Sequence, residues 1–264
     1  MGFLAFIGRP VLGFLAYLGG LAHLSGELAA SLLRGQRRWA QLLRQIAEIG
    51  FRSQMVVVVT GAFTGAVLAA QSLFQFKLFR VETAAGGLVS VAMLRELGPT
   101  ITALMLAGRV GSAMAAEIGT MKVTEQIDAL RTMAVHPVDY LVAPRFLAIL
   151  IAMPLLIAES AVFGILASYC VGVFAFQVPD AYWMQHVKSY TDMSDITIAG
   201  VKGLVFGVLI VIISCHQGLG ASNGAVGVGR GTTRAMVYSS LAILIANFFL
   251  TLLMQAIFPA NLGK

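Results

Sequence analysis

The chain has 264 residues, of which 58% are hydrophobic and only 11% are charged, whereas about a quarter of the residues of a soluble domain are charged. This composition excludes an ordinary soluble protein and indicates an integral membrane protein. The formal net charge of +6 does not indicate nucleic-acid binding, because the basic residues lie between apolar segments, where they orient a membrane protein. No hydrophilic stretch is long enough for a second domain, so we expect residues 1–264 to form one domain.

The first 33 residues mix apolar side chains with glycine, Arg9, His23 and Glu27. Their apolar stretches are shorter than the ~20 residues that a span requires, which favours an amphipathic helix lying in the membrane interface. A basic set follows, which we interpret as an orientation signal rather than a surface for lipid headgroups: Arg34, Arg37, Arg38, Arg44 and Arg52. Residues 1–53 are therefore predicted to be an interfacial and basic amino-terminal segment.

Five apolar segments are predicted to span the membrane, at about residues 54–74, 86–117, 145–176, 196–215 and 237–258. Gly61 and Gly65 in the first span have the Gly-x-x-x-Gly spacing that lets helix backbones approach closely, as do Gly203 and Gly207 in the fourth. The second span is longer than a membrane requires, so we expect tilt or a kink near Pro99.

Five spans place the two termini on opposite sides of the membrane. Most cations fall on one side: Arg9, Arg34, Arg37, Arg38, Arg44, Arg52, Lys122, Arg131, Arg145, Arg230 and Arg234. The other side carries Lys77, Arg80, Lys188 and Lys264, with Glu82 in the same loop as Arg80. Because cytoplasmic loops are enriched in lysine and arginine, we predict a cytoplasmic amino terminus and a carboxyl terminus outside.

Charged side chains within the predicted spans are costly to bury and by default mark a functional site or a structural pair. Arg95 lies roughly 13 Å below the outer interface, counted from Gly86 at helical rise. We predict that Arg95 and Glu96 line a lipid cavity, the alternative being an ion pair between two spans. Arg109 is assigned to the same cavity, although it lies near the cytoplasmic end, where reaching the interface is an equal alternative.

Glu159 and Lys202 are predicted to lie at nearly the same depth. Glu159 lies roughly 21 Å from the cytoplasmic side and Lys202 roughly 9 Å from the outside, in a hydrocarbon core of about 30 Å. Consecutive spans often pack together, so an ion pair between the two is predicted. The alternatives are a protonated Glu159 bonded within its own span and a Lys202 that contacts a lipid headgroup.

Residues 124–133, between the second and third spans, are predicted to form a short polar helix in the cytoplasm. Thr124 can cap its start, and Glu125 suits the positive end of the helix dipole. The helix is interpreted either as a docking element or as an ordinary solvated loop helix. In a docking element an apolar row would be buried against a partner, with charged side chains at its rim. The row consists of Ile127, Leu130 and Met133, and the rim of Glu125, Asp128 and Arg131.

Sequence signatures of catalysis are absent. No G-x-x-x-x-G-K-[ST] occurs, so the chain does not hydrolyse ATP by the P-loop route. The glycine-rich stretch at residues 218–231 lacks the lysine of a phosphate-binding loop and is interpreted as a flexible connection. The four histidines match no metal-binding spacing: His23, His136, His186 and His216. We expect no catalytic residue, metal or cofactor on this chain.

Two runs carry a resemblance to a known family. The run LRELGPTITALMLAGRVGSAMAAEIGTMKVTEQIDALRTMAVHPVDYLVAPR, residues 94–145, resembles the MlaE (YrbE) permeases of MCE-type ABC lipid transporters. The run GVGRGTTRAMVYSSLAIL, residues 227–244, is similar to the final loop and span of that family. The resemblance covers about residues 44–258.

The resemblance implies an all-α integral membrane protein with an amino-terminal interfacial helix, five transmembrane helices and a short cytoplasmic coupling helix at about residues 117–137. It implies a multi-pass permease of the inner membrane that moves phospholipids or related lipids to or from the outer envelope. The implied partners are a second copy of the chain, a cytoplasmic ABC ATPase dimer that binds ATP and magnesium, a periplasmic ring of MCE-domain proteins and, in some complexes, a small cytoplasmic accessory subunit. The charges at Arg95, Glu96, Arg109 and Lys202 match the family pattern, whereas Glu159 does not belong to it.

Two other classes of function remain open. A secondary transporter or channel would use the intramembrane charges as an ion relay and would need no ATPase. A structural scaffold of the envelope would leave those charges unexplained. Inverted repeats, which would favour a secondary transporter, are not found in the sequence, and co-purification of an ATPase would separate the first class from the other two.

Overall fold

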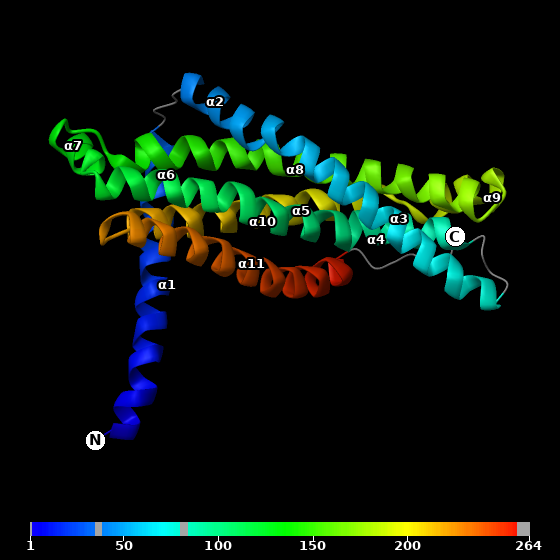
Figure 1. The fold of residues 1–264 in the computed structure, drawn as a ribbon, viewed down its shortest axis with the longest axis horizontal. Helices are drawn as coiled ribbons and strands as arrows, with labels where there is room; N and C mark the ends of the chain where they lie inside the picture. Colours follow the sequence, from blue (N-terminus) through cyan, green and yellow to red (C-terminus); the bar gives the residue numbers. More distant parts are fainter. Residues whose placement is uncertain (1, 35–38, 80–83, 258–264) are drawn as a thin grey trace.

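The computed structural model describes residues 2–34, 39–79 and 84–257, and the regular elements of these ranges are all helical (Figure 1). The predicted all-α fold is thereby confirmed. Some residues discussed above lie outside the described ranges: Arg37, Arg38, Arg80, Glu82, Phe258 and Lys264.

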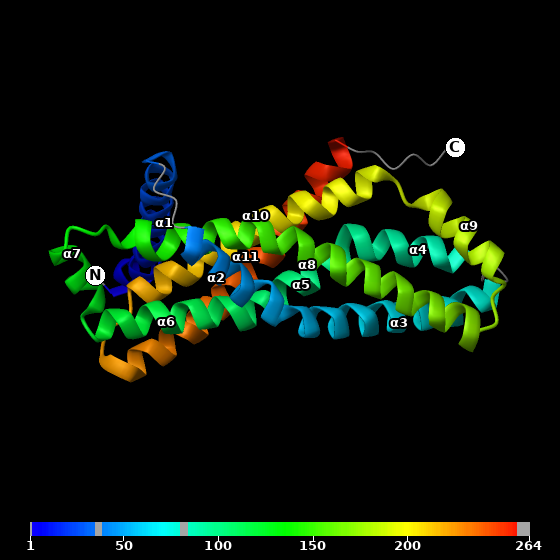
Figure 2. The ribbon, with the colours of Figure 1, turned by 90° about the horizontal axis from the view of Figure 1, so that it is seen from above.

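Most helices run side by side along the long axis of the molecule and form a bundle (Figures 1 and 2). In chain order they are α2 (Trp39–Ile49), η1 (Phe51–Ser53), α3 (Gln54–Phe79), α4 (Ala85–Ala92), η3 (Met93–Leu97), α5 (Gly98–Leu106), η4 (Ala107–Gly111), α6 (Ser112–Val123), η5 (Val138–Val142), α8 (Ala143–Cys170), η6 (Val171–Ala175), α10 (Met193–Leu219) and α11 (Gly224–Ile257). Two short helices lie at opposite ends of the bundle, α7 (Gln126–Thr132) and α9 (Asp180–Tyr190) (Figure 1).

Within the described residues, six helical segments are long and apolar enough to cross a membrane. They are Val11–Arg34, Trp39–Phe79, Ala85–Val123, Val138–Ala175, Met193–Leu219 and Gly224–Ile257. The last five contain the predicted spans, apart from the final residues of the third and the fifth. The connection predicted between the third and fourth spans contains α9, which is held on α4 by Trp183. This tryptophan is fully buried and lies against Gly86 and Gly172.

α1 (Gly2–Arg34) runs across the bundle rather than along it, at the end that carries α7 (Figures 1 and 2). The expectation that no stretch here reaches the length of a span is wrong, because the segment from Val11 to Arg34 does so. Leu24 and Leu28 pack into the core of the bundle, whereas Leu12 and Phe14 are exposed. A helix perpendicular to the bundle has the direction expected of a helix in the interface, so the interfacial placement stays our prediction.

The close approach predicted for Gly61 and Gly65 is confirmed. A Cβ atom at Gly61 would lie 2.6 Å from the Ser160 carbonyl oxygen of α8, and one at Gly65 would lie 2.1 Å from the Gly164 carbonyl oxygen. α3 and α8 therefore pack backbone against backbone, which only residues without a side chain permit.

The glycine-rich stretch differs from its prediction as a flexible connection. Only residues 220–223 separate α10 from α11, and the glycines from Gly224 onward are helical. Val228 packs closely against Gly119 of α6, and α11 lies along both α6 and α10. Tertiary packing therefore outweighs the low helix propensity of glycine here.

The helix from Ala85 to Val123 is irregular near Pro99, and the predicted tilt or kink stays a prediction. The π-helical turn η3 ends two residues before this proline, which lies in the first turn of α5. Proline has no backbone N–H, so the carbonyl of Arg95, four residues earlier, lacks its ordinary helical donor. A carbonyl is thus left available inside the bundle.

Candidate functional site

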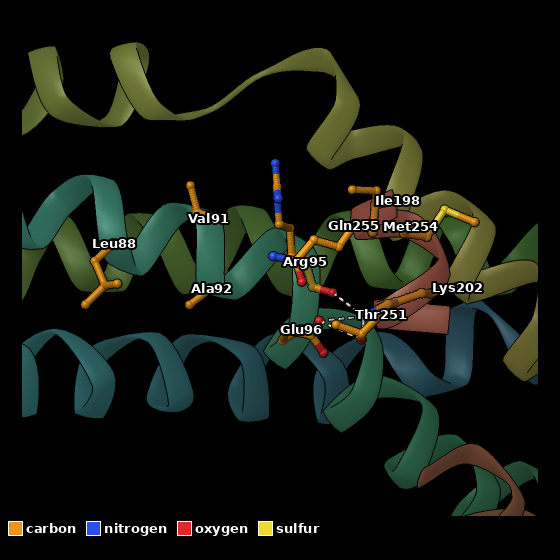
Figure 3. A pocket seen from close by; sticks show the side chains of 10 residues that line it. All are labelled: Leu88, Val91, Ala92, Arg95, Glu96, Ile198, Lys202, Thr251, Met254 and Gln255. Atoms are coloured by element: carbon orange, nitrogen blue, oxygen red, sulfur yellow. Dashed lines mark hydrogen bonds and ion pairs between the residues drawn. The ribbon is translucent and has the colours of Figure 1, made fainter. Parts of the chain in front are cut away.

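A cleft of about 230 Å³ opens where α4 and η3 meet α10 and α11 (Figure 3). Half of its lining is apolar, from Leu88, Val91, Ala92, Ile198 and Met254. The polar half consists of Arg95, Glu96, Lys202, Thr251 and Gln255. The cleft therefore combines an apolar wall with charged groups on helices that are long and apolar enough to cross a membrane.

Lys202 lies at the centre of the polar half and is fully buried. Its Nζ donates to the Arg95 carbonyl at 2.7 Å, to Glu96 Oε1 at 2.8 Å and to Thr251 Oγ1 at 2.9 Å. An ammonium group has three N–H donors, so all of them are used. The carbonyl that Pro99 leaves free is one of the three acceptors, and Lys202 has no donor left for a lipid headgroup.

Glu96 joins three elements. Its Oε1 accepts from Lys202 of α10 and from Thr251 Oγ1 of α11 at 2.9 Å, and its Oε2 accepts from Asn247 Nδ2 of α11 at 3.1 Å. The side chain remains 39% exposed. Asn247 and Thr251 were not identified from the sequence, because a lone polar residue in an apolar span has no spacing that assigns it a partner.

Arg95 is held by a second buried partner. Its Nε donates to Oδ1 of Asp195, which is fully buried in the first turn of α10. Oδ2 of Asp195 accepts from the Asp192 backbone N–H at 2.9 Å, as part of a capping box. The spacing of Asp192 and Asp195 could have identified the start of α10, but nothing in the sequence indicated the contact with Arg95.

The predicted ion pair between Glu159 and Lys202 is wrong. Lys202 pairs with Glu96, and across the described part of the chain no hydrogen bond or ion pair reaches Glu159. The face of α8 that meets α10 carries Ile157, which lies against Gly203. Glu159 follows Ile157 by two residues, about 200° around the helix, on a face with the exposed side chains of Leu155 and Val162.

Arg109 does not line this cleft, and its assignment to a lipid cavity stays a prediction. It lies fourteen residues after Arg95, roughly 21 Å further along the helix. Its Nη1 donates to Ser53 Oγ and so joins η4 to η1. A further buried charge, Arg145, was interpreted only as an orientation signal, yet its Nη2 lies 2.6 Å from Glu117 Oε2 and ties α8 to α6.

α7 confirms the predicted helix between the second and third spans but not its predicted cap. Glu125 precedes the helix in a left-handed conformation (φ 61°) and makes no capping bond. Thr124 Oγ1 donates instead to the Thr120 carbonyl at 2.8 Å. Ile127 is fully buried in the core of this chain, so it is not available to a partner, whereas Leu130 is half-buried and Met133 is 65% exposed.

The charged side of α7 is internally paired. Asp128 lies 3.0 Å from Lys122 Nζ and 3.1 Å from Arg131 Nη1. The hydrogen bond from Lys122 lowers the pKa of Asp128, and Arg131 adds to the effect. Asp128 therefore stays ionised at neutral pH and holds α7 against the end of α6.

Comparison with known proteins identifies the family. A model of the MlaE permease family matches residues 42–253. The chain belongs to the MlaE permease family. It is 41% identical over 245 residues to a probable ABC transporter permease protein of Rickettsia conorii, covering 93% of this chain and 95% of that protein.

Two further relatives of this MlaE permease carry more specific names. The intermembrane phospholipid transport system permease protein MlaE of Haemophilus influenzae is 34% identical over 255 residues, with 96% and 98% of the two chains covered. The chloroplast protein TRIGALACTOSYLDIACYLGLYCEROL 1 of Arabidopsis thaliana is 36% identical over 228 residues, with 86% and 65% covered. The family that residues 94–145 and 227–244 indicated is thus confirmed, and the chain is a multi-pass membrane permease rather than an enzyme.

Proposed function

We propose that this MlaE permease is the membrane subunit of an ATP-driven ABC transporter that moves phospholipids or related lipids between the inner membrane and the outer envelope. The observation that supports this proposal is an ion-paired cluster beside an apolar cleft, formed by Arg95, Glu96, Asp195 and Lys202. An amphiphile needs such a site, because its chains require an apolar wall and its headgroup requires polar groups.

An ion relay, the alternative, receives less support from the same contacts. A relay needs a group that can release and regain its ion along a path. Lys202 is buried, and each of its three donors is bonded within the chain. The group at the centre of the cluster is therefore a structural cation rather than a carrier.

The proposal includes partners and cofactors on other chains. We place ATP and magnesium on a cytoplasmic ATPase dimer, the permease in a homodimer, and a ring of MCE-domain proteins on the periplasmic side. A small accessory subunit can join on the cytoplasmic side. The test of the function is ATP-dependent movement of a labelled phospholipid by the complex reconstituted in vesicles; absence of movement with an active ATPase would contradict it.

We further propose that α7 docks on the ATPase. Met133→Asp should weaken co-purification of the ATPase roughly tenfold, because a charge would enter the apolar part of the contact. The exposed position should leave the melting temperature of the permease unchanged. Met133 is the better position than Leu130, which packs against the core of its own chain.

Ile127→Ala is the control for α7 that should affect stability, whereas Met133→Asp should affect binding of the ATPase. It should lower the melting temperature, because a buried side chain is truncated. Full ATPase binding by Met133→Asp would exclude α7 as the docking element.

The orientation is also proposed, with the amino terminus in the cytoplasm and the carboxyl terminus outside. α6, α7 and the starts of α2 and α11 lie at one end of the bundle, whereas α9 and the end of α3 lie at the other (Figure 1). An alkaline phosphatase fused after Lys264 should be active, since this enzyme folds only outside the cytoplasm. An inactive fusion together with an active cytoplasmic reporter at the same position would reverse the orientation.

A further inference from the structure

The four charged side chains of the cluster beside the cleft divide into a buried pair and an exposed pair. Lys202 and Asp195 are fully buried, whereas the side chains of Glu96 and Arg95 are 39% and 22% exposed. Each exposed charged side chain therefore forms an ion pair with a buried side chain of opposite charge. The surface of the cleft presents one anion and one cation.

Both exposed groups have unused hydrogen-bonding capacity. Arg95 uses Nε for Asp195, and within the described residues its two terminal nitrogens have no acceptor. In the part of the chain that the structure describes, Oε2 of Glu96 accepts only from Asn247, although a carboxylate oxygen can accept two bonds. The end of Arg95 is therefore free to bind an oxyanion, and Glu96 is free to accept from an ammonium group.

The two groups lie at separate places along the cleft. Both side chains line it, and Figure 3 shows them leaving their helix in different directions. Neighbouring residues of a helix point about 100° apart, which explains the separation. A ligand that satisfies both must carry its positive and negative charges on different atoms.

The sum of the charges favours a ligand without net charge. Arg95 and Lys202 balance Glu96 and Asp195, so the cleft is neutral before a lipid binds. A lipid with a net charge of −1 would bring an uncompensated charge into an apolar environment, which is unfavourable. A zwitterionic headgroup would instead pair each of its charges with one side chain.

We infer that the cleft selects phospholipids with a zwitterionic headgroup, with the phosphate bound at Arg95 and the ammonium group at Glu96. This inference rests on the proposed lipid transport and adds a preference among lipids. It predicts that phosphatidylethanolamine is a better substrate than phosphatidylglycerol with the same acyl chains.

The test measures ATP-dependent transport of both labelled lipids by the complete complex in vesicles that contain equal amounts of each. The wild-type protein should move phosphatidylethanolamine several-fold faster. The double variant Glu96→Lys, Lys202→Glu keeps an ion pair but makes the exposed group positive. The net charge of the cluster stays zero, but the exposed anion that binds the ammonium group is gone. This variant should therefore lose the preference for phosphatidylethanolamine.

Two further variants separate selectivity from stability. Thr251→Val removes two hydrogen bonds of the cluster and leaves all charges in place, so it should slow both lipids and leave their ratio unchanged. Glu96→Gln keeps an acceptor for Lys202 but removes the exposed anion, so it should slow phosphatidylethanolamine more than phosphatidylglycerol. It replaces the double variant if that variant elutes as an aggregate in size-exclusion chromatography.

The possible failures are distinguishable. No ATP-dependent movement of either lipid by the wild-type complex would contradict the proposed function. Equal transport of the two lipids by the wild-type protein, or a ratio that the charge variants leave unchanged, would overturn the inference about the headgroup while lipid transport stands.

Discussion

Gly65→Leu should abolish the folded, monodisperse state of the permease. A Cβ atom at this position would lie 2.1 Å from the carbonyl oxygen of Gly164 and 2.7 Å from its Cα. The clash begins at the first side-chain atom and meets backbone, so no change of rotamer relieves it. We expect a cost above the ~1–3 kcal/mol of ordinary overpacking, because α3 and α8 would have to separate.

Gly200→Leu is the matched control for this substitution. Gly200 lies in α10, within an apolar segment, and a Cβ atom there would meet nothing within 4 Å. The measurement is the yield of monodisperse protein in size-exclusion chromatography, together with its melting temperature. If the Gly65 and Gly200 variants behaved alike, the packing of α3 on α8 would be refuted.

Lys202→Met should lower the stability of the permease by about 2–3 kcal/mol, less than the ~3–5 kcal/mol for a fully buried ion pair, because the Glu96 side chain is 39% exposed. The substitution leaves Glu96 without its cation and the Arg95 carbonyl without its donor. Adding Glu96→Gln should restore a large part of the lost stability, because the unpaired charge disappears. Thermal unfolding in detergent measures both effects.

Glu159 provides the control for this cycle. Because it lies on another face of α8 and does not contact Lys202, Glu159→Gln should add independently to Lys202→Met. Strong coupling between Glu159 and Lys202, with weak coupling between Glu96 and Lys202, would contradict the observed network.

The sequence alone determined the class of fold and the principal segments. Apolar runs long enough to cross a bilayer predicted the five spans, and the spacing of Gly61 and Gly65 predicted the close approach of α3. The short polar segment around Asp128 predicted α7 between two spans, although not its cap. These features depend on composition and on residues close in the chain, which is the information that periodicity and motif spacing contain.

The partners of the charged residues were decided by the tertiary structure. Counting residues along the helices places Glu159 and Lys202 at a similar depth in the membrane. Depth alone does not determine a contact, because the rotation of each helix about its axis decides which side chains face each other. Lys202 faces η3, where Pro99 has released the carbonyl of Arg95. Asp195 reaches Arg95 across one hundred residues of sequence. Such contacts follow from the packing of whole helices, because local sequence patterns do not determine how a helix is rotated relative to its neighbours.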